Sequence, residues 1–276
     1  MPDIIYLQLG AEGLPQFEIA AKNMRKVEPQ AKIILYTDQS ESSLSLQSHD
    51  EYRYWSHPLN FSKNSTFGTT DFGHVTLEKP RVILDALQKC SDWILFSDVD
   101  IVALKPFTQE INQALTRKQF WVSCEGNEIQ PRNHCTGLLA ISPKNETVDL
   151  LNQWILHHES LLKSNGACHD QTAFNSLIHS KPTLELGISV FPLGYAMPGW
   201  LFPMMFPIPS NRVTPTFFHC NWVKGHSKKL NRMNQIDSVV QTRQTWPKFI
   251  VGLFVIIAQR FTHNRPPFRF WRSLDK

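Results

Sequence analysis

Short apolar runs, separated by a stretch of helical periodicity, set the pattern at the start of the chain. Residues 4–9 and 32–38 each predict a buried strand. Between them, Pro15 opens a stretch with apolar residues at helical spacing, and Pro29 closes it. A strand, a helix and a second strand in this order predict a parallel sheet with right-handed crossovers.

The alternation of strands and helices continues along the chain. Further strands are expected at residues 52–55, 93–96, 120–124 and 136–141, and helices are expected to start at 78–81, 142–143 and 169. Residues 59–76, rich in Asn, Ser, Thr and Gly, predict an ordered loop over a site, and residues 182–211, with six prolines, predict irregular structure. The fold class is therefore α/β, with a mostly parallel sheet flanked by helices.

The segment Trp93–Pro106 carries the clearest candidate chemistry. Its apolar run ends abruptly at Asp98, and because side chains alternate along a strand, Asp98 and Asp100 project to the same side. Ligands of open parallel sheets bind at this end of a central strand. Two adjacent carboxylates favour a hard divalent metal between them, which leaves positions for phosphates. The sequence predicts a metal site for a nucleotide diphosphate; the alternative is a strand exit with two solvated carboxylates.

Three more polar side chains are candidates for the same edge of the sheet. Asp38 ends the second strand, where it would bind a base or ribose, or else cap the polar loop that follows. Lys79 and Arg81 precede the metal strand by one helix length and could help neutralise a diphosphate leaving group. The alternative for both is a solvated charge at a helix start.

A further group of candidates lies near a predicted strand end at His219. A neutral imidazole is a good third ligand beside two carboxylates, although His219 taken alone would more often be structural. Lys228 could approach a phosphate over the bare backbone of Gly225. His158 is expected at the edge of the core rather than as a ligand.

Composition limits the class of protein. The 276 residues, 42% apolar and 19% charged, describe a folded chain of one large domain or two small ones. Five scattered cysteines without a C-x-x-C pair, and no visible N-terminal signal, indicate a reducing, cytoplasmic compartment. Of the net charge of +4, residues 230–276 carry +6 (eight Lys or Arg, two Asp) and the remainder carries −2. The body is therefore not expected to bind nucleic acid.

Four motifs occur in the order found in a known family. They are Ser97-Asp98-Val99-Asp100, His134-Cys135-Thr136-Gly137, Asp170-Gln171-x-x-Phe174-Asn175 and His219-x-Asn221-Trp222-x-x-Gly225-x-x-Lys228. Over about residues 4–230 the pattern resembles the nucleotide-diphospho-sugar transferases, metal-dependent glycosyltransferases of the GT-A fold. It is similar to glycosyltransferase families 77 and 8. The resemblance implies a Rossmann-like, mixed and mostly parallel sheet.

The resemblance also implies roles for the motif residues. Asp98, Asp100 and His219 would hold Mn²⁺, or Mg²⁺, on the diphosphate of a donor that is expected to be a UDP-sugar. Other residues would contact the donor or the reaction centre: Lys228 a phosphate, Gly137 the sugar, and Asp170 and Gln171 the sugar and the reacting carbon. Transfer with retention to a hydroxyl of a glycan or a lipid-linked acceptor is expected.

Composition changes again near residue 230. We expect a transferase domain over residues 1–230 and a basic, amphipathic helical tail over residues 231–276. Residues 249–258 are ten apolar residues, too few to span a bilayer, and Lys and Arg side chains interleaved with aromatic ones flank them. This composition suits an interfacial helix on the inner face of a membrane, in peripheral contact with anionic lipid. A helix packed on the domain is the alternative.

Two other functions fit parts of the sequence. Haloacid-dehalogenase-type phosphatases also use an Asp-x-Asp at a strand end, but near the start of the chain and with a later acidic pair. Here Asp98 follows nearly a hundred residues, and no Asp-Asp or Gly-Asp pair follows Asp170. A non-catalytic adaptor that binds a membrane surface through its tail is the other alternative.

Overall fold

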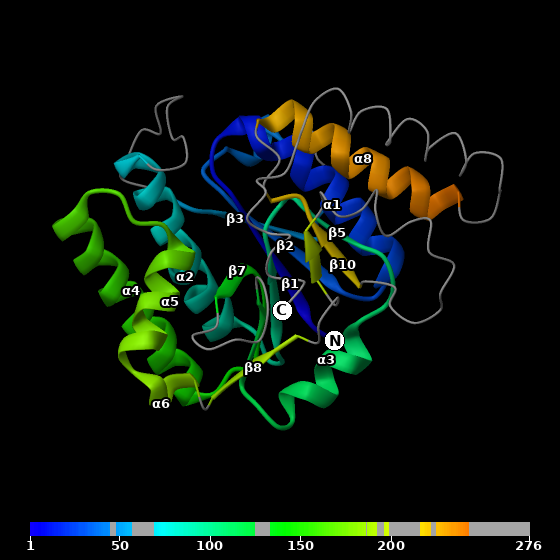
Figure 1. Cartoon of the computed structure of the whole chain (residues 1–276). Helices are drawn as coiled ribbons and strands as arrows, with labels where there is room; N and C mark the ends of the chain where they lie inside the picture. The colour runs from blue at the N-terminus through cyan, green and yellow to red at the C-terminus, as the bar shows by residue number, and fades with distance from the viewer. Residues whose placement is uncertain are drawn as a thin grey trace, which may run out of the picture.

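The computed structural model describes residues 1–44, 48–56, 69–124, 133–185, 187–191, 196–198, 216–221 and 225–242. Over these residues the strands form a seven-stranded sheet and a three-stranded sheet. Helices cover both faces of the larger sheet (Figure 1).

The larger sheet has the order β3-β2-β1-β4-β7-β6-β8. Neighbouring strands pair in parallel except at β7, which is antiparallel to both β4 and β6. The predicted α/β fold with a mixed, mostly parallel sheet is thus confirmed. Its strands are β1 (Asp3–Gln8), β2 (Lys32–Thr37), β3 (Glu51–Tyr54), β4 (Ile94–Ser97), β6 (Phe120–Cys124), β7 (His134–Ile141) and β8 (Ile188–Val190).

Helices pack on the two faces because alternate strand residues point to opposite sides. In β1, Ile4 and Tyr6 belong to one apolar core and Ile5 to the other. The first core is covered by α1 (Leu14–Val27), α3 (Thr108–Leu115) and α8 (His226–Thr242). The second is covered by α2 (Thr70–Lys89), α4 (Asn145–Asn165) and α5 (Asp170–Ser180), and the short α6 (Pro182–Glu185) lies next to α5 (Figure 1).

The smaller sheet joins distant parts of the chain. It contains β5 (Ile101–Ala103), β10 (Phe217–His219) and β9 (Ala196–Pro198), in the order β5-β10-β9. Strand β10 is antiparallel to β5, with His219 opposite Ile101. Because β5 follows β4 almost directly, this register brings the end of β10 to the end of β4.

Helix α2 begins earlier than predicted, at Thr70 rather than at residues 78–81. The hydroxyl oxygen of Thr69 accepts a hydrogen bond from the Phe72 backbone N–H at 3.2 Å, which caps the helix. Gly73 lies against the chain before α5, where a Cβ would be 2.5 Å from the Cys168 carbonyl oxygen. Close packing therefore extends the helix through polar residues that predicted a loop. Residues 59–68 of that predicted loop lie outside the described residues.

Two other predicted boundaries were wrong. Helix α4 begins at Asn145 and not at Ser142, because the Ser142 hydroxyl donates to the Gln119 carbonyl at 3.1 Å instead of capping the helix. Residues 182–211 are not uniformly irregular, since α6, β8 and β9 lie within them. Most of the rest of that range lies outside the described residues.

Helix α8 continues across residue 230. Its Met233 and Ile236 are fully buried, and the helix packs against α1. The first part of the predicted tail is therefore integral to the core, and residues 243–276 lie outside the described residues. Within the described part of the chain, no helix is both long and apolar enough to cross a membrane.

Candidate active site

Strand β4 delivers two carboxylates to the edge of the sheet. Its four residues are all buried, and the chain turns after Ser97, where the Ile101 N–H donates to the Asp98 carbonyl at 3.2 Å. The Asp98 N–H donates to the Gly137 carbonyl on β7 at 2.8 Å, and the Cys220 N–H donates to the Asp100 carbonyl at 2.9 Å. Both aspartates are thus held by their backbones against neighbouring strands.

His219 completes a cluster of three potential metal ligands. Its Nε2 lies 3.7 Å from Oδ2 of Asp98 and 3.2 Å from Oδ1 of Asp100. One ligand atom from each of the three residues lies within 4.8 Å of the other two. The structure therefore brings together the three residues predicted as metal ligands, through the pairing of β10 with β5.

Gly137 makes room for this cluster. A Cβ at this position would lie 2.4 Å from Cε1 of His219 and 2.9 Å from Oδ2 of Asp98. Because β7 is antiparallel to β4, its early residues face the cluster. The missing side chain thus has a structural reason beside its predicted contact with a sugar, which stays a prediction.

Two lysines pair with the carboxylates. Lys79 Nζ lies 2.9 Å from Oδ1 of Asp98 and 2.6 Å from Oδ2 of Asp170, so it joins these two aspartates. Lys229 Nζ lies 2.6 Å from Oδ2 of Asp100. Sequence reasoning singled out Lys79 but not Lys229.

Asp170 opens helix α5 beside the cluster. It is buried, and its Oδ2 accepts a hydrogen bond from the Thr136 hydroxyl at 2.6 Å as well as pairing with Lys79. Its carbonyl accepts from the Trp154 indole N–H at 3.1 Å, and this fixes the start of the helix. Gln171 follows in the same first turn, and its carbonyl accepts from the Asn175 side chain at 2.8 Å. The catalytic roles of Asp170 and Gln171 stay predictions.

The lysines and His219 decide the charge states of the carboxylates. Burial would raise the pKa of Asp100, but His219 and Lys229 outweigh it and hold this pKa well below its usual range. Burial would also raise the pKa of Asp170, but Lys79 outweighs it and lowers this pKa. Burial does raise the pKa of Asp98. Asp100 and Asp170 are therefore ionised at neutral pH.

Cys135 lies on the other side of the histidine ring. Its buried Sγ is 3.7 Å from Nδ1 of His219, so the thiol contacts one ring nitrogen while Nε2 faces the carboxylates. A second partner of this kind orients a metal-binding imidazole. Sequence reasoning did not find this contact; the signal available was the position of Cys135 beside Thr136 and Gly137 in the same motif.

Asp38 ends β2 at the same edge of the sheet but outside the metal-ligand cluster. Its Oδ1 accepts hydrogen bonds from the Gly10 N–H and the Gln39 side-chain amide, both at 2.8 Å. Gly10 has a φ of 76°, which favours glycine. Asp38 thus stabilises the loop after β1, and its predicted contact with a base or ribose stays a prediction.

Among the described residues, the other predicted cations, Lys228 and Arg81, do not pair with Asp98, Asp100 or Asp170. Lys228 is exposed on the first turn of α8, while Lys229 points to Asp100. Gly225 has a φ of 89° and open space around its α-carbon, so it serves the turn into α8. The phosphate contact of Gly225 and Lys228 stays a prediction. Arg81 pairs with Glu78 of α2 at 2.7 Å and with Glu159 of α4 at 2.6 Å.

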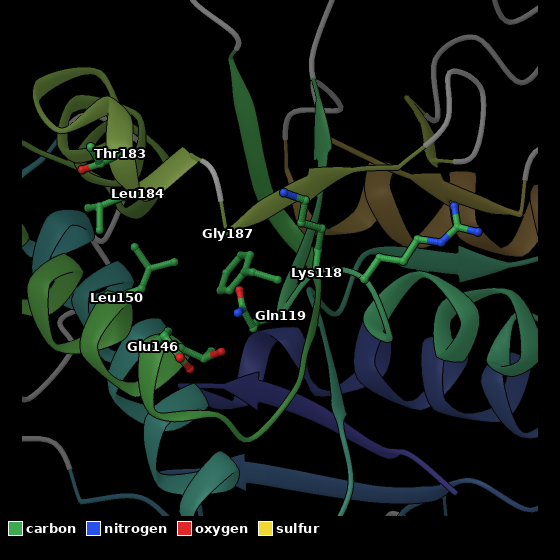
Figure 2. A pocket seen from close by; sticks show the side chains of 10 residues that line it. Lys118, Gln119, Glu146, Leu150, Thr183, Leu184 and Gly187 are labelled. Carbon is green, nitrogen blue, oxygen red and sulfur yellow. The ribbon is translucent and has the colours of Figure 1, made fainter.

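A hollow of about 480 Å³ lies at the opposite edge of the sheet (Figure 2). Strand β6 runs in the same direction as β4 and begins there at Phe120, whereas Asp98 follows the end of β4. The hollow is lined by residues that include Arg117, Lys118, Glu146, Leu150, Thr183 and Leu184. It contains none of the predicted site residues, so it is not the predicted donor site.

The Asp-x-Asp after β4 and the histidine of β10 beside it form the arrangement expected of a nucleotide-sugar-dependent transferase. A sequence model described as nucleotide-diphospho-sugar transferase matches residues 31–233. The chain belongs to this family and is a glycosyltransferase, as the four motifs predicted. The phosphatase and the non-catalytic alternatives are accordingly not favoured. No curated protein matches the chain in sequence.

Solved glycosyltransferase structures share the fold. The chain is similar to the galactosyltransferase LgtC, in complex with donor and acceptor sugar analogs, with TM-score 0.56 and 15% identity over 91% of this chain and 99% of that one. It is similar to a glycosyltransferase involved in the glycosylation of the major capsid of PBCV-1, with TM-score 0.51 and 13% identity over 84% of this chain and 100% of that one. It is also similar to the glycosyltransferase GlyE of Streptococcus pneumoniae TIGR4, with TM-score 0.55 and 15% identity over 87% of this chain and 63% of that one. These likenesses establish the GT-A fold.

Proposed function

We propose that the chain is a divalent-metal-dependent glycosyltransferase that moves a sugar from a UDP-sugar to a hydroxyl of a glycan or lipid-linked acceptor. The observation that carries this proposal is the convergence of Asp98, Asp100 and His219 at one point of the sheet edge. Family membership supports a nucleotide-sugar donor. The choice of UDP rests on the resemblance to the family.

The donor set fits Mn²⁺ or Mg²⁺. Each carboxylate gives one oxygen to a lysine and turns the other toward His219 Nε2, so two oxygens and one nitrogen face a common point. Carboxylate oxygens with one imidazole suit Mn²⁺, and a carboxylate site that keeps open positions suits Mg²⁺ with substrate phosphates. When bound, such an ion would offset the charge on a departing nucleoside diphosphate.

The other residues of the site would act on the sugar. Lys79 joins Asp170 to Asp98, so the Asp170 carboxylate lies next to the metal-ligand cluster. An ionised carboxylate there would stabilise positive charge that develops on the anomeric carbon. Gln171, the next residue, would hold the sugar. If the acceptor hydroxyl attacks on the leaving-group face, no strong base is needed, and configuration is retained.

A donor panel tests this function. We expect one UDP-sugar, among UDP-, GDP- and CDP-sugars, to raise the melting temperature in the presence of Mn²⁺ and to be hydrolysed or transferred slowly. Asp100→Asn and His219→Gln should each lower turnover by about 100-fold or more, because each removes a ligand. Asp92→Asn is the control, since its exposed carboxylate pairs with the N-terminus at 3.2 Å. Full activity of either site variant would refute the metal assignment.

The acceptor side of the proposal concerns the C-terminal segment. Residues 243–276 hold most of the basic and aromatic side chains of the predicted tail. We infer that this segment contacts anionic lipid at the inner face of a membrane, which would place the enzyme near a lipid-linked acceptor. Its amino-acid composition supports this part of the proposal.

A further inference from the structure

The two lysines that pair with the metal-ligand carboxylates differ in how firmly they are held. Lys79 contacts Asp98 and Asp170, and its Nζ also lies 3.4 Å from the Thr136 carbonyl oxygen. Its side chain is 11% exposed. Lys79 is therefore fixed within the site from several sides.

Lys229 is held much less firmly. Its Nζ contacts one carboxylate, at 2.6 Å from Asp100 Oδ2, and its side chain is 30% exposed. It is half-buried on the first turn of α8, beside the exposed Lys228. A flexible four-carbon side chain in this position can swing into solvent without unpacking the core.

We propose that Lys229 is a built-in competitor for the metal: it neutralises Asp100 in the metal-free protein and is driven off this carboxylate when a divalent cation binds. The inference rests on the proposed metal site. With Lys229 in place, Asp98, Asp100 and Asp170 face two ammonium groups. A divalent ion bound by Asp98, Asp100 and His219 would lie close to the Lys229 ammonium group, which already pairs with Oδ2 of Asp100.

The cause of this competition is repulsion between the Lys229 ammonium group and the divalent ion. Like charges a few ångströms apart in a partly buried site repel strongly, because little water screens them. Lys229 therefore leaves Asp100 when the ion binds, and the loss of this ion pair weakens metal binding. The advantage to the protein is that the buried Asp100 has a second partner beside His219, one on each carboxylate oxygen.

Binding of Mn²⁺ alone, without nucleotide, tests the proposal. Free Mn²⁺ is measured by electron paramagnetic resonance at fixed pH, for wild type and for Lys229→Gln. Removing the ammonium should tighten Mn²⁺ binding by on the order of tenfold, since the ion pair no longer has to be broken. Lys229→Arg keeps the charge and should bind Mn²⁺ no more tightly than wild type. Unchanged or weaker binding by Lys229→Gln would overturn the proposal.

Two controls separate the possible failures. Lys26→Gln removes the same charge from another ion pair of α8, in which Lys26 Nζ lies 2.9 Å from Asp237, and should leave Mn²⁺ affinity unchanged. Asp100→Asn should abolish Mn²⁺ binding. If Asp100→Asn binds Mn²⁺ like wild type, the proposed metal site itself fails; if it loses binding while Lys229→Gln is unaltered, only the competition by Lys229 fails.

Folding of the variants is checked by thermal unfolding with and without Mn²⁺. Lys229→Gln should melt earlier than wild type without metal, because Asp100 loses its lysine partner and keeps only His219, and should gain more from added Mn²⁺. If Lys229→Gln does not fold, Lys229→Arg decides: tighter Mn²⁺ binding by this variant would contradict the proposal.

Discussion

Gly137 controls the site through the atoms that it lacks. A Cβ there would collide with the His219 ring at 2.4 Å and crowd Asp98 at 2.9 Å. The ring cannot shift easily, because His219 is held on β10, Cys135 contacts its Nδ1 and both carboxylates face its Nε2. A single methyl group at this position would therefore separate the three potential ligands.

We predict that Gly137→Ala folds but binds Mn²⁺ at least about tenfold more weakly and loses most of its activity. Overpacking should cost about 1–3 kcal/mol of stability, a cost that a domain of this size can bear. Isothermal titration with Mn²⁺ and denaturant unfolding measure the two effects. Gly187→Ala is the control, since its Cβ would meet the flexible end of Gln119 at 3.1 Å. Undiminished Mn²⁺ affinity of Gly137→Ala would contradict this account of the site.

At the scale of elements, the strand that leads to Asp98 was predictable and the partners of Asp98 were less so. An apolar run that ends in Asp-x-Asp fixes which side both carboxylates face, because strand side chains alternate. Successive residues of a helix point in directions about 100° apart. Whether Lys228 or Lys229 points toward Asp100 therefore depends on the placement of α8, which the sequence does not fix. Helix starts are the weakest part of sequence prediction, as α2 and α4 also show.

Long-range pairing limited the prediction in a different way. His219 was expected as a ligand from its motif, but the reason for its position is the register of β10 with β5, which no local pattern contains. The joining of Asp98 to Asp170 by Lys79 likewise needs α2 and α5 to pack on one face of the sheet.

Helix α4 carries a buried histidine that makes stability depend on pH. Burial lowers the pKa of His158, whose Nε2–H donates to the Cys168 carbonyl at 3.0 Å. His158 binds a proton more readily in the unfolded chain than in the folded one. The contribution of neutral His158 to the free energy of unfolding is therefore complete above a pH of about 6.5 and is lost as the pH falls.

We therefore expect the change in the free energy of unfolding between pH 7.5 and pH 5.5 to be less unfavourable for His158→Gln than for wild type, because the variant lacks the loss that His158 causes. Urea unfolding at several pH values measures the slope. The matched control is His179→Gln, because His179 is exposed on α5. Equal slopes for wild type and His158→Gln would show that His158 does not carry the effect.

At the scale of the whole molecule, the two apolar cores enclose the sheet and leave its carboxyl edge for the site. Helix α8 contributes to both functions: Met233 and Ile236 complete the core, and Lys229 contacts Asp100. A division at residue 230 would therefore cut through a packed helix. The membrane role of the basic segment is best tested by removing only residues 243–276.

We predict that the full chain sediments with vesicles containing phosphatidylserine and that a variant ending at Thr242 does not. The expected cause is attraction of the basic, aromatic segment to anionic lipid, so binding should fall with added salt. Vesicles of phosphatidylcholine alone are the control. Equal sedimentation of the two proteins would dispose of the membrane role, and a melting temperature near that of the full chain would show that the shorter one is folded.

The most direct test of the central claim is a crystal structure of the chain with Mn²⁺, with anomalous scattering recorded at the manganese edge. We predict one strong anomalous peak within coordinating distance of an oxygen of Asp98, an oxygen of Asp100 and Nε2 of His219. A peak elsewhere, or His219 turned away from both carboxylates with the ion bound, would contradict the account.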